Sequence, residues 1–139
     1  MSKTILRTRT DIQNESFFKY YSKNIRNIIS SGNYIIGSET RKFETEFSKY
    51  LKTKKTIGVA NGTDAIYLCL KLLGIGKGDE VITTSFTAFP TISAILMTSA
   101  KPVFADIDYK TWLIDKDEII KKITKKTKAI IPVHIFGNV

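Results

Sequence analysis

The order of apolar and polar residues predicts two helices in the first part of the chain. Apolar residues recur at nearly helical spacing over residues 17–29, and the polar run at residues 30–33 ends this predicted helix. A second helix is expected from Ser38, which can cap it, with Glu39 beside the positive end of the helix dipole. Its apolar residues fall on one face, which we expect to pack on something larger. That face consists of Phe43, Phe47, Tyr50 and Leu51.

From residue 56 onward the pattern predicts strands that alternate with helices. Short apolar runs predict four strands, at residues 56–60, 80–84, 103–106 and 129–133. Helices are expected between them, at residues 64–73, 90–98 and 115–123, and the last begins with a sequence like a capping box, Asp115-Lys116-Asp117-Glu118. Short apolar strands separated by helices form sheets covered on both faces. The predicted fold class is therefore α/β, a mainly parallel sheet within three layers.

Length and composition support one folded unit. The chain has 139 residues, of which 42% are hydrophobic, and shows neither an internal repeat nor a second-domain boundary. No stretch approaches the ~20 consecutive apolar residues of a membrane helix, so no membrane partner is expected. Residues 1–15 are polar, are expected to be extended or mobile, and lack a signal-peptide pattern. A cytoplasmic location is the expectation.

The chain carries a net charge of +9, but its basic residues are dispersed. Even the densest basic run, residues 121–128, crosses a predicted helix-to-strand junction, so we interpret the charge as a solvated surface. It also favours anionic small substrates, whereas no nucleic-acid partner is expected. Cys69 lies in an apolar helical run and is predicted to be a small buried hydrophobe. His134 has no second histidine or cysteine with which to bind a metal, so no metal site is predicted.

The segment Asn61-Gly62-Thr63-Asp64 joins the first predicted strand to the helix that follows it. A helix N-terminus at the end of a parallel strand is suited to bind a phosphate. Gly62 lets the backbone approach an anion, the Thr63 hydroxyl can donate a hydrogen bond, and the N–H groups of Thr63, Asp64 and Ala65 are candidate donors. The same residues fit an alternative in which Thr63 or Asp64 merely caps the helix.

Three more predicted strands end in polar or aromatic residues, at positions 85–91, 106–108 and 134–137. Because the carboxyl ends of parallel strands meet at one edge of a sheet, these segments favour a binding site over a set of ordinary turns. The glycines at 74, 76 and 78 follow a helix and precede a strand, which is the wrong order for a dinucleotide fingerprint. We expect them to end the helix and turn the chain.

The ordered set of motifs resembles the sugar aminotransferases of the DegT/DnrJ/EryC1/StrS family. The motifs are GNYIIG, NGTDA, GIGKGDEVI, SFTAFPT, PVFADID and TKAIIPVHIFG, and their order and spacing agree across nearly all of residues 25–139. The resemblance implies an enzyme of fold type I that depends on pyridoxal 5′-phosphate and aminates keto groups on nucleotide-linked sugars. It also implies a homodimer when the enzyme is full length, and an amino donor such as glutamate.

The resemblance implies roles for five residues of this sequence. Gly62, Thr63 and Asp64 match the segment that binds the cofactor phosphate. Thr87 and Ala88 match the segment over the pyridine ring, where many members have an aromatic residue at the position of Ala88. The expected organisation is an N-terminal extension with the start of the first helix over residues 1–24, and the N-terminal part of the cofactor-binding large domain over residues 25–139.

Members of this family are more than twice as long as this chain. The resemblance places the lysine that forms the Schiff base beyond the equivalent of Val139, and no lysine here, Lys101 included, matches its motif. We therefore assign no catalytic residue and expect the N-terminal part of a sugar aminotransferase, inactive as an isolated chain. Two alternatives remain open: a non-catalytic fragment that binds a partner such as a full-length paralogue, and a small nucleotide-binding α/β domain.

Overall fold

The computed structural model describes residues 15–139. The chain divides into two compact units, Met1–Gly58 and Val59–Val139, which are described separately. Apart from Glu15, which belongs to the first helix, the segment predicted to be extended lies outside the described residues. The predicted domain limits at residues 24 and 25 stay a prediction.

The first unit contains the two predicted helices, α1 (Glu15–Ser30) and α2 (Ser38–Leu51). The cap of α2 differs from the prediction, because Gly37 rather than Ser38 is the N-cap residue and no side chain caps the helix. The backbone explains this difference. A Cβ atom at Gly37 would lie 2.0 Å from the carbonyl oxygen of Asn33, so only glycine fits where the chain turns into α2.

The apolar face of α2 has the predicted spacing. The Phe43 and Phe47 rings stack with centroids 5.4 Å apart, and the Phe47 and Tyr50 rings stack at 6.1 Å. However, α2 buries none of its residues, and Tyr50 is 79% exposed. The amphipathic pattern is therefore confirmed, whereas the described residues of the first unit do not provide the packing expected for this face.

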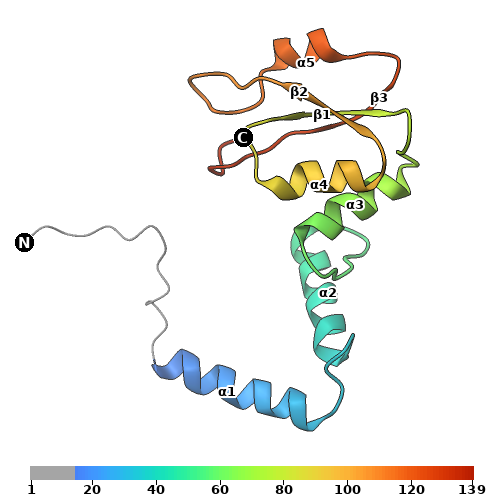
Figure 1. Cartoon of the computed structure of the whole chain (residues 1–139). Coiled ribbons are helices and arrows are strands. Elements are labelled where there is room, and N and C mark those ends of the chain that lie inside the picture. Colours follow the sequence, from blue (N-terminus) through green and yellow to red (C-terminus); the bar gives the residue numbers. More distant parts are fainter. Residues whose placement is uncertain (1–14) are drawn as a thin grey trace, which may run out of the picture. The chain divides into compact units, whose positions relative to one another are not determined.

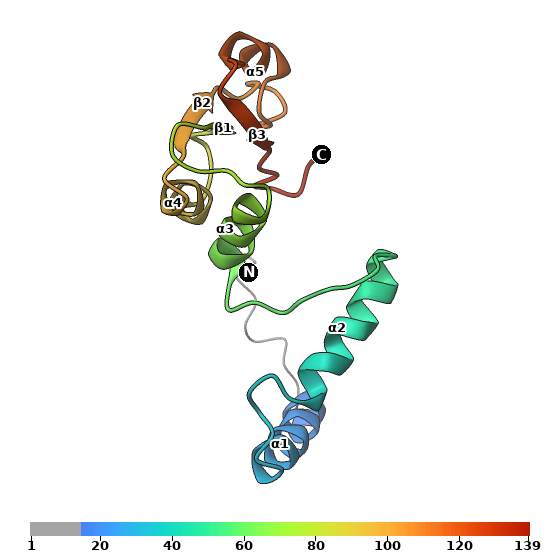
Figure 2. The same ribbon diagram turned by 90° about the vertical axis from the view of Figure 1, so that its right-hand side faces the viewer.

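The second unit is built on a parallel sheet of three strands in the order β2-β1-β3. The strands are β1 (Glu80–Thr84), β2 (Lys101–Ala105) and β3 (Thr127–Ile131). Helices α3 (Gly62–Leu72) and α4 (Phe89–Met97) lie on one face of the sheet, and α5 (Lys116–Lys122) lies on the other (Figure 1, Figure 2). The predicted α/β class, the parallel sheet and the three layers are confirmed.

One predicted strand is wrong, because residues 56–60 form neither a helix nor a strand. A strand exists only where a neighbouring strand accepts and donates its backbone hydrogen bonds. Among the described residues the sheet has three strands, and none of them pairs with this segment. The composition of the segment fits a strand, but its partner cannot be read from local sequence.

The core of the second unit lies between β1 and the helices α3 and α4. All five residues of β1 are buried, as expected for the central strand, whereas β2 and β3 are buried only in part. One buried cluster joins the three elements and the turns beside them: Leu70, Ile75, Val81, Ile95 and Ala100. This packing fixes where α3 and α4 begin relative to the strand ends.

The glycine-containing turn after α3 acts as predicted. Gly74 has φ +74°, and its N–H donates to the carbonyl of Lys71 while the Ile75 N–H donates to that of Leu70. This is a complete Schellman motif, and the two residues that make its apolar contact, Leu70 and Ile75, belong to the core cluster. The prediction of a helix cap, and not a dinucleotide loop, is confirmed.

The start of α5 is capped, but not by a full capping box. The Asp115 carboxylate accepts a hydrogen bond from the Asp117 N–H at 2.7 Å, as an N-cap residue does. The returning bond from Glu118 is absent because its carboxylate binds Lys121 Nζ at 2.7 Å and the Asp115 N–H donates to the Asp106 carbonyl at 2.8 Å. The second half of the predicted box is therefore wrong.

Cys69 is exposed, so the prediction that it is buried is wrong. It lies in an apolar groove between α3 and β3. The residues that line this groove are Ala65, Ile66, Cys69, Leu70, Leu73, Ala129, Ile130 and Ile131. Helical periodicity identified an apolar face correctly, but no segment of the second unit covers this part of it.

None of the described helices is long and apolar enough to cross a membrane.

Candidate functional site

The carboxyl ends of the three strands and the N-termini of α3 and α4 meet at one end of the second unit. The loops that follow β1, β2 and β3 lie together at that end of the sheet (Figure 1). Helix α3 leads through a short turn into the start of β1, so its C-terminus lies at the opposite end and its N-terminus points toward the loops. We call this end the carboxyl rim. It is where parallel α/β sheets bind their ligands.

The N-terminus of α3 is organised by Asn61. The Asn61 Oδ1 atom accepts a hydrogen bond from the Asp64 N–H at 2.9 Å, and Asn61 Nδ2 donates to the Asp64 carboxylate at 3.1 Å. The Ala65 N–H donates to the Asn61 carbonyl at 3.1 Å. This reciprocal pair acts as a capping box and turns the Asp64 carboxylate back toward the cap.

These bonds correct the set of candidate phosphate donors. The N–H groups of Asp64 and Ala65 are already used within the chain, so they are not free for a ligand. The alternative in which Thr63 or Asp64 caps the helix is also wrong, because Asn61 is the N-cap residue. Among residues 15–139, no protein acceptor binds the N–H groups of Gly62 and Thr63 or the Thr63 hydroxyl.

Gly62 leaves open space at the first turn of α3. A Cβ atom built at this position would meet no heavy atom within 4 Å, and the backbone is not in the left-handed region that favours glycine. The packing of the described residues therefore does not require a glycine here. Two N–H donors, a hydroxyl and free space at a helix N-terminus fit a phosphate group.

Thr87 and Ala88 lie in the loop between β1 and α4. The Thr87 Oγ1 atom is 2.8 Å from Thr91 Oγ1, and Ala88 is the exposed N-cap residue of α4. Helices α3 and α4 pack together, but no hydrogen bond joins Thr87 or Ala88 to the first turn of α3 in the described part of the chain. The structure thus brings both predicted segments to the carboxyl rim, with no hydrogen bond between them among residues 15–139.

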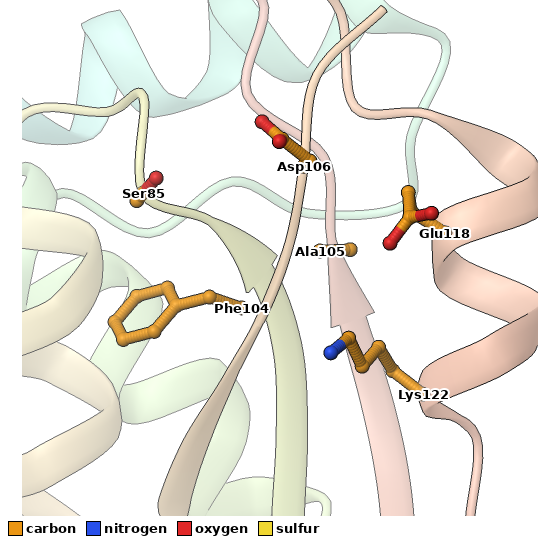
Figure 3. A pocket seen from close by; sticks show the side chains of 6 residues that line it. All are labelled: Ser85, Phe104, Ala105, Asp106, Glu118 and Lys122. Carbon is orange, nitrogen blue, oxygen red and sulfur yellow. The ribbon is translucent and has the colours of Figure 1, made fainter.

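A shallow polar hollow lies at the edge of the rim, between β2 and α5 (Figure 3). Glu118 and Lys122 point into it from α5, while Ser85 and Asp106 follow the ends of β1 and β2. The hollow carries two carboxylates and one ammonium group, a mixture that favours neither an anion nor a cation. In residues 15–139, no cluster of three or more metal-binding side chains occurs here or elsewhere, and His134 is exposed.

Three aromatic rings gather at the rim, one from each loop. Phe86 follows β1, Trp112 lies in the loop after β2, and Phe136 follows β3. The centroid of the Phe86 ring is 5.4 Å from that of Trp112 and 6.0 Å from that of Phe136, and Trp112 and Phe136 are 6.4 Å apart. The sequence placed Phe86 and Phe136 at strand ends but gave no reason to single out Trp112. The contact among the three rings depends on the order of the strands, which local sequence does not show.

The loop that carries Trp112 is held by Asp108. One carboxylate oxygen of Asp108 accepts hydrogen bonds from the N–H groups of Lys110 and Thr111 and from the Thr111 hydroxyl, at 3.0, 2.8 and 2.9 Å. These bonds, those from Thr111 above all, hold the pKa of Asp108 below its ordinary value. An antiparallel bridge between Ile107 and Ile114 closes the loop. The result is an ordered turn with Trp112 at its tip.

Comparison with known proteins agrees with this architecture. The DegT/DnrJ/EryC1/StrS aminotransferase family matches residues 18–139 of the chain. The chain is 42% identical over 114 residues to a dTDP-3-amino-3,4,6-trideoxy-alpha-D-glucose transaminase of Micromonospora megalomicea subsp. nigra, covering 82% of this chain and 30% of that protein. It is 41% identical over 114 residues to a UDP-2-acetamido-2-deoxy-3-oxo-D-glucuronate aminotransferase of Pseudomonas aeruginosa, covering 82% of this chain and 32% of that protein.

Solved structures show the same similarity. NtdA of Bacillus subtilis, solved with the bound cofactor PMP, superposes with a TM-score of 0.85 at 33% identity, over 89% of this chain and 28% of that one. The chain thus spans about a third of the length of these relatives. Its fold matches that of the fold type I aminotransferases over this part of their length. The chain belongs to the DegT/DnrJ/EryC1/StrS family of pyridoxal-phosphate-dependent sugar aminotransferases.

Proposed function

We propose that this chain is the N-terminal part of an aminotransferase for nucleotide-linked keto sugars, and that it holds the cofactor phosphate. The observation that carries the proposal is the first turn of α3. There, two N–H groups and the Thr63 hydroxyl have no acceptor among residues 15–139, and Gly62 leaves open space beside them. Pyridoxal phosphate, when bound, supplies an electron sink for the transfer of an amino group. The residues described here bind and orient it.

Each of the five predicted residues has a separate part in this proposal. Gly62 and Thr63 donate hydrogen bonds to the phosphate, while Asp64 keeps the turn in shape through its bonds to Asn61. Thr87 and Ala88 lie beside the ring, and the contact between Thr87 and Thr91 fixes that loop. Ala88 adds no aromatic surface of its own. The proposal thus gives Asp64 a positioning role and not a direct contact.

The proposed substrates and partners follow from the relatives. The two transaminases described above are named for dTDP-linked and UDP-linked sugars, which supports a nucleotide-linked sugar as the substrate class. Glutamate as the amino donor and a homodimer of the whole enzyme complete the proposal. The net charge of +9 is compatible with a substrate that carries phosphates.

We expect the 139-residue chain by itself to have no aminotransferase activity. Lys101 was considered as a substitute for the lysine that forms the Schiff base. It lies at the start of β2, at the end of the sheet opposite the rim. Its Nζ atom is paired with Glu80 at 3.3 Å. Purified chain incubated with pyridoxal phosphate and glutamate should release no 2-oxoglutarate in a coupled dehydrogenase assay. Release of 2-oxoglutarate above that of a control without the chain would contradict this part of the proposal.

Phosphate binding can be tested on the same chain. Thr63→Val keeps the shape of the side chain but removes the hydroxyl, and we expect the Kd for pyridoxal phosphate, measured by equilibrium dialysis, to rise about tenfold. Thr53→Val is the matched control, because Thr53 is exposed and lies in the other unit. Equal affinities of the Thr63→Val variant and the unmodified chain would refute the assignment of α3.

Two exposed apolar surfaces support the non-catalytic alternative. The apolar groove between α3 and β3 and the exposed aromatic face of α2 both offer surface to a partner chain. The two functions differ in one measurement. A chain that only binds a partner should bind pyridoxal phosphate equally before and after Thr63→Val, whereas the proposed enzyme should not.

A further inference from the structure

We infer that Phe86, Trp112 and Phe136 form an aromatic platform that binds the planar heterocycle of a phosphate-bearing ligand. The inference deepens the proposed function and rests on it for the phosphate, which α3 would hold at the same rim. Two sources share this chemistry: the base of a nucleotide-linked sugar and the pyridine ring of the cofactor. The geometry of the platform is independent of α3.

The three rings do not cover one another. Their planes meet at 46°, 57° and 76°, so no pair is stacked face to face. In the described part of the chain, Trp112 is 46% exposed and Phe136 is 74% exposed. Rings buried together in a small core would be shielded by each other and by the loops. Here ring surface remains available to a further ring.

The backbone holds Trp112 in an unfavourable conformation. Its φ is +61°, in the left-handed region that residues with a side chain seldom adopt. The Trp112 N–H donates to the Asp108 carbonyl at 2.9 Å, and the Asp108 carboxylate binds the preceding turn. Strained residues that are held this firmly occur preferentially at binding sites. The strain at Trp112 therefore supports a role in recognition.

A planar heterocycle is the ligand group that such rings bind best. Nucleic-acid bases stack on aromatic side chains with little dependence on base identity, because every base has a π-face. The platform and the first turn of α3 lie at the same end of the sheet. A ligand with a ring and a phosphate could therefore use both. The alternative, in which the rings only stabilise the loops, predicts no response to such ligands.

Trp112 reports directly on the platform because it is the only tryptophan of the chain. The experiment is a fluorescence titration of the whole 139-residue chain with uridine diphosphate, thymidine diphosphate, pyridoxal phosphate, uridine and ribose 5-phosphate. Free N-acetyltryptophanamide corrects for light absorbed by the ligands. We expect every ligand with a heterocycle to quench the Trp112 fluorescence saturably. Uridine, which has no phosphate, should need a higher concentration than the nucleotides, and ribose 5-phosphate should not quench.

Variants separate the platform from nonspecific binding. Phe86→Leu and Phe136→Leu should each raise the Kd of the preferred ring-bearing ligand about tenfold, because each removes one ring. Phe89→Leu is the matched control, since Phe89 is exposed on α4 and belongs to no ring contact of the platform. Far-UV circular dichroism establishes that each variant is folded. Because Phe136 is largely exposed, its variant should fold normally.

The ligand that binds more tightly identifies the source: a diphosphate nucleotide points to the substrate base, and pyridoxal phosphate points to the cofactor. Quenching by ribose 5-phosphate equal to that by the nucleotides would overturn the inference. The same holds if no ring-bearing ligand quenches at millimolar concentration, or if Phe86→Leu and Phe136→Leu bind as the unmodified chain does. Thr63→Val tests the phosphate site separately. If it leaves affinity unchanged while Phe86→Leu weakens it, the platform stands and the phosphate proposal fails.

Discussion

The two ends of the small sheet differ in how the chain satisfies its polar groups. At the amino end, the Glu80 carboxylate accepts hydrogen bonds from the Thr124 hydroxyl at 2.7 Å and from Lys101 Nζ at 3.3 Å. These bonds tie β1 to β2 and to the turn before β3. At the carboxyl rim, the N–H groups of Gly62 and Thr63 have no protein acceptor in the described residues, and aromatic rings are exposed. One end is closed by the chain itself, whereas the other keeps unbonded donors and exposed rings.

The core cluster lies toward the closed end, so the largest loss of stability should come from there. Ile95 on α4 is completely buried, and Ile95→Ala should lower the free energy of unfolding by about 2–5 kcal/mol through lost burial and a new cavity. Urea unfolding measures the loss. The neighbouring Leu96 is 54% exposed, so Leu96→Ala is the matched control with a much smaller effect. Equal losses for the two variants would show that the core does not lie where we describe it.

Removal of the charge of Glu80 should have a smaller and pH-dependent effect. The hydrogen bond from Thr124, and then the nearby Lys101, lower the pKa of Glu80. The ionised carboxylate therefore stabilises the fold above the unfolded pKa of about 4.3, and this contribution is lost as the pH falls through the lower folded value. The Tm of Glu80→Gln should lie below that of the unmodified chain at pH 7, and the difference should shrink below about pH 4.

The control for this pH profile is Glu46→Gln. Glu46 is an exposed glutamate of α2 without a hydrogen bond among the described residues. Its variant should unfold with the Tm of the unmodified chain at every pH. A difference in Tm between Glu80→Gln and the unmodified chain that does not change between pH 7 and pH 3 would contradict the role given to the ionised carboxylate.

At the open end, loss of the Asn61 cap should cost about 1 kcal/mol of stability. Asn61→Ala removes the acceptor of the Asp64 N–H and the donor to its carboxylate, so the first turn of α3 should also bind phosphate less tightly. Asn61→Ser keeps a capping oxygen and should recover most of the stability. Guanidinium unfolding and equilibrium dialysis measure the two effects. Equal stability of Asn61→Ala and Asn61→Ser would contradict the cap.

The smallest change in stability, and the clearest distinction between the two ends, should come from Gly62→Ala. A Cβ atom at Gly62 meets nothing within 4 Å, so this variant should keep or gain up to about 1 kcal/mol of stability. The added methyl group should nevertheless hinder a phosphate at the helix N-terminus. Higher thermal stability together with weaker binding of pyridoxal phosphate would indicate a glycine retained for a ligand. Unchanged binding would count against a phosphate site at the first turn of α3.

Local sequence predicted most of the helices and strands of the second unit. The limits of β1 agree residue for residue, and α3, α4 and β2 agree to within two residues. Alternation and capping are properties of neighbouring residues, so the sequence contains them. The prediction of a strand at residues 56–60 failed because a strand also needs a neighbouring strand to pair with. The prediction of Ser38 as the N-cap residue failed because the Asn33 carbonyl approaches Gly37 closely, and the order of residues in the sequence does not reveal such an approach.

The candidate site was predicted in part. The sequence located the first turn of α3 and the loop before α4 but overstated the free donors, because it could not show that Asn61 binds the Asp64 N–H. The aromatic platform was missed for another reason. Its rings come from three loops, and their contact depends on the order β2-β1-β3 and on the left-handed backbone of Trp112. Neither is a local property of the sequence.

The exposed Cys69 has a practical consequence for the proposed homodimer. It is the only cysteine of the chain and lies open in the groove between α3 and β3. Air oxidation can therefore join two copies through one disulfide, and the product stops at two chains because no thiol is left. In size-exclusion chromatography such a covalent pair has the mass of a genuine dimer. Only a dimer that persists in dithiothreitol, or in Cys69→Ser, reports noncovalent association of this chain.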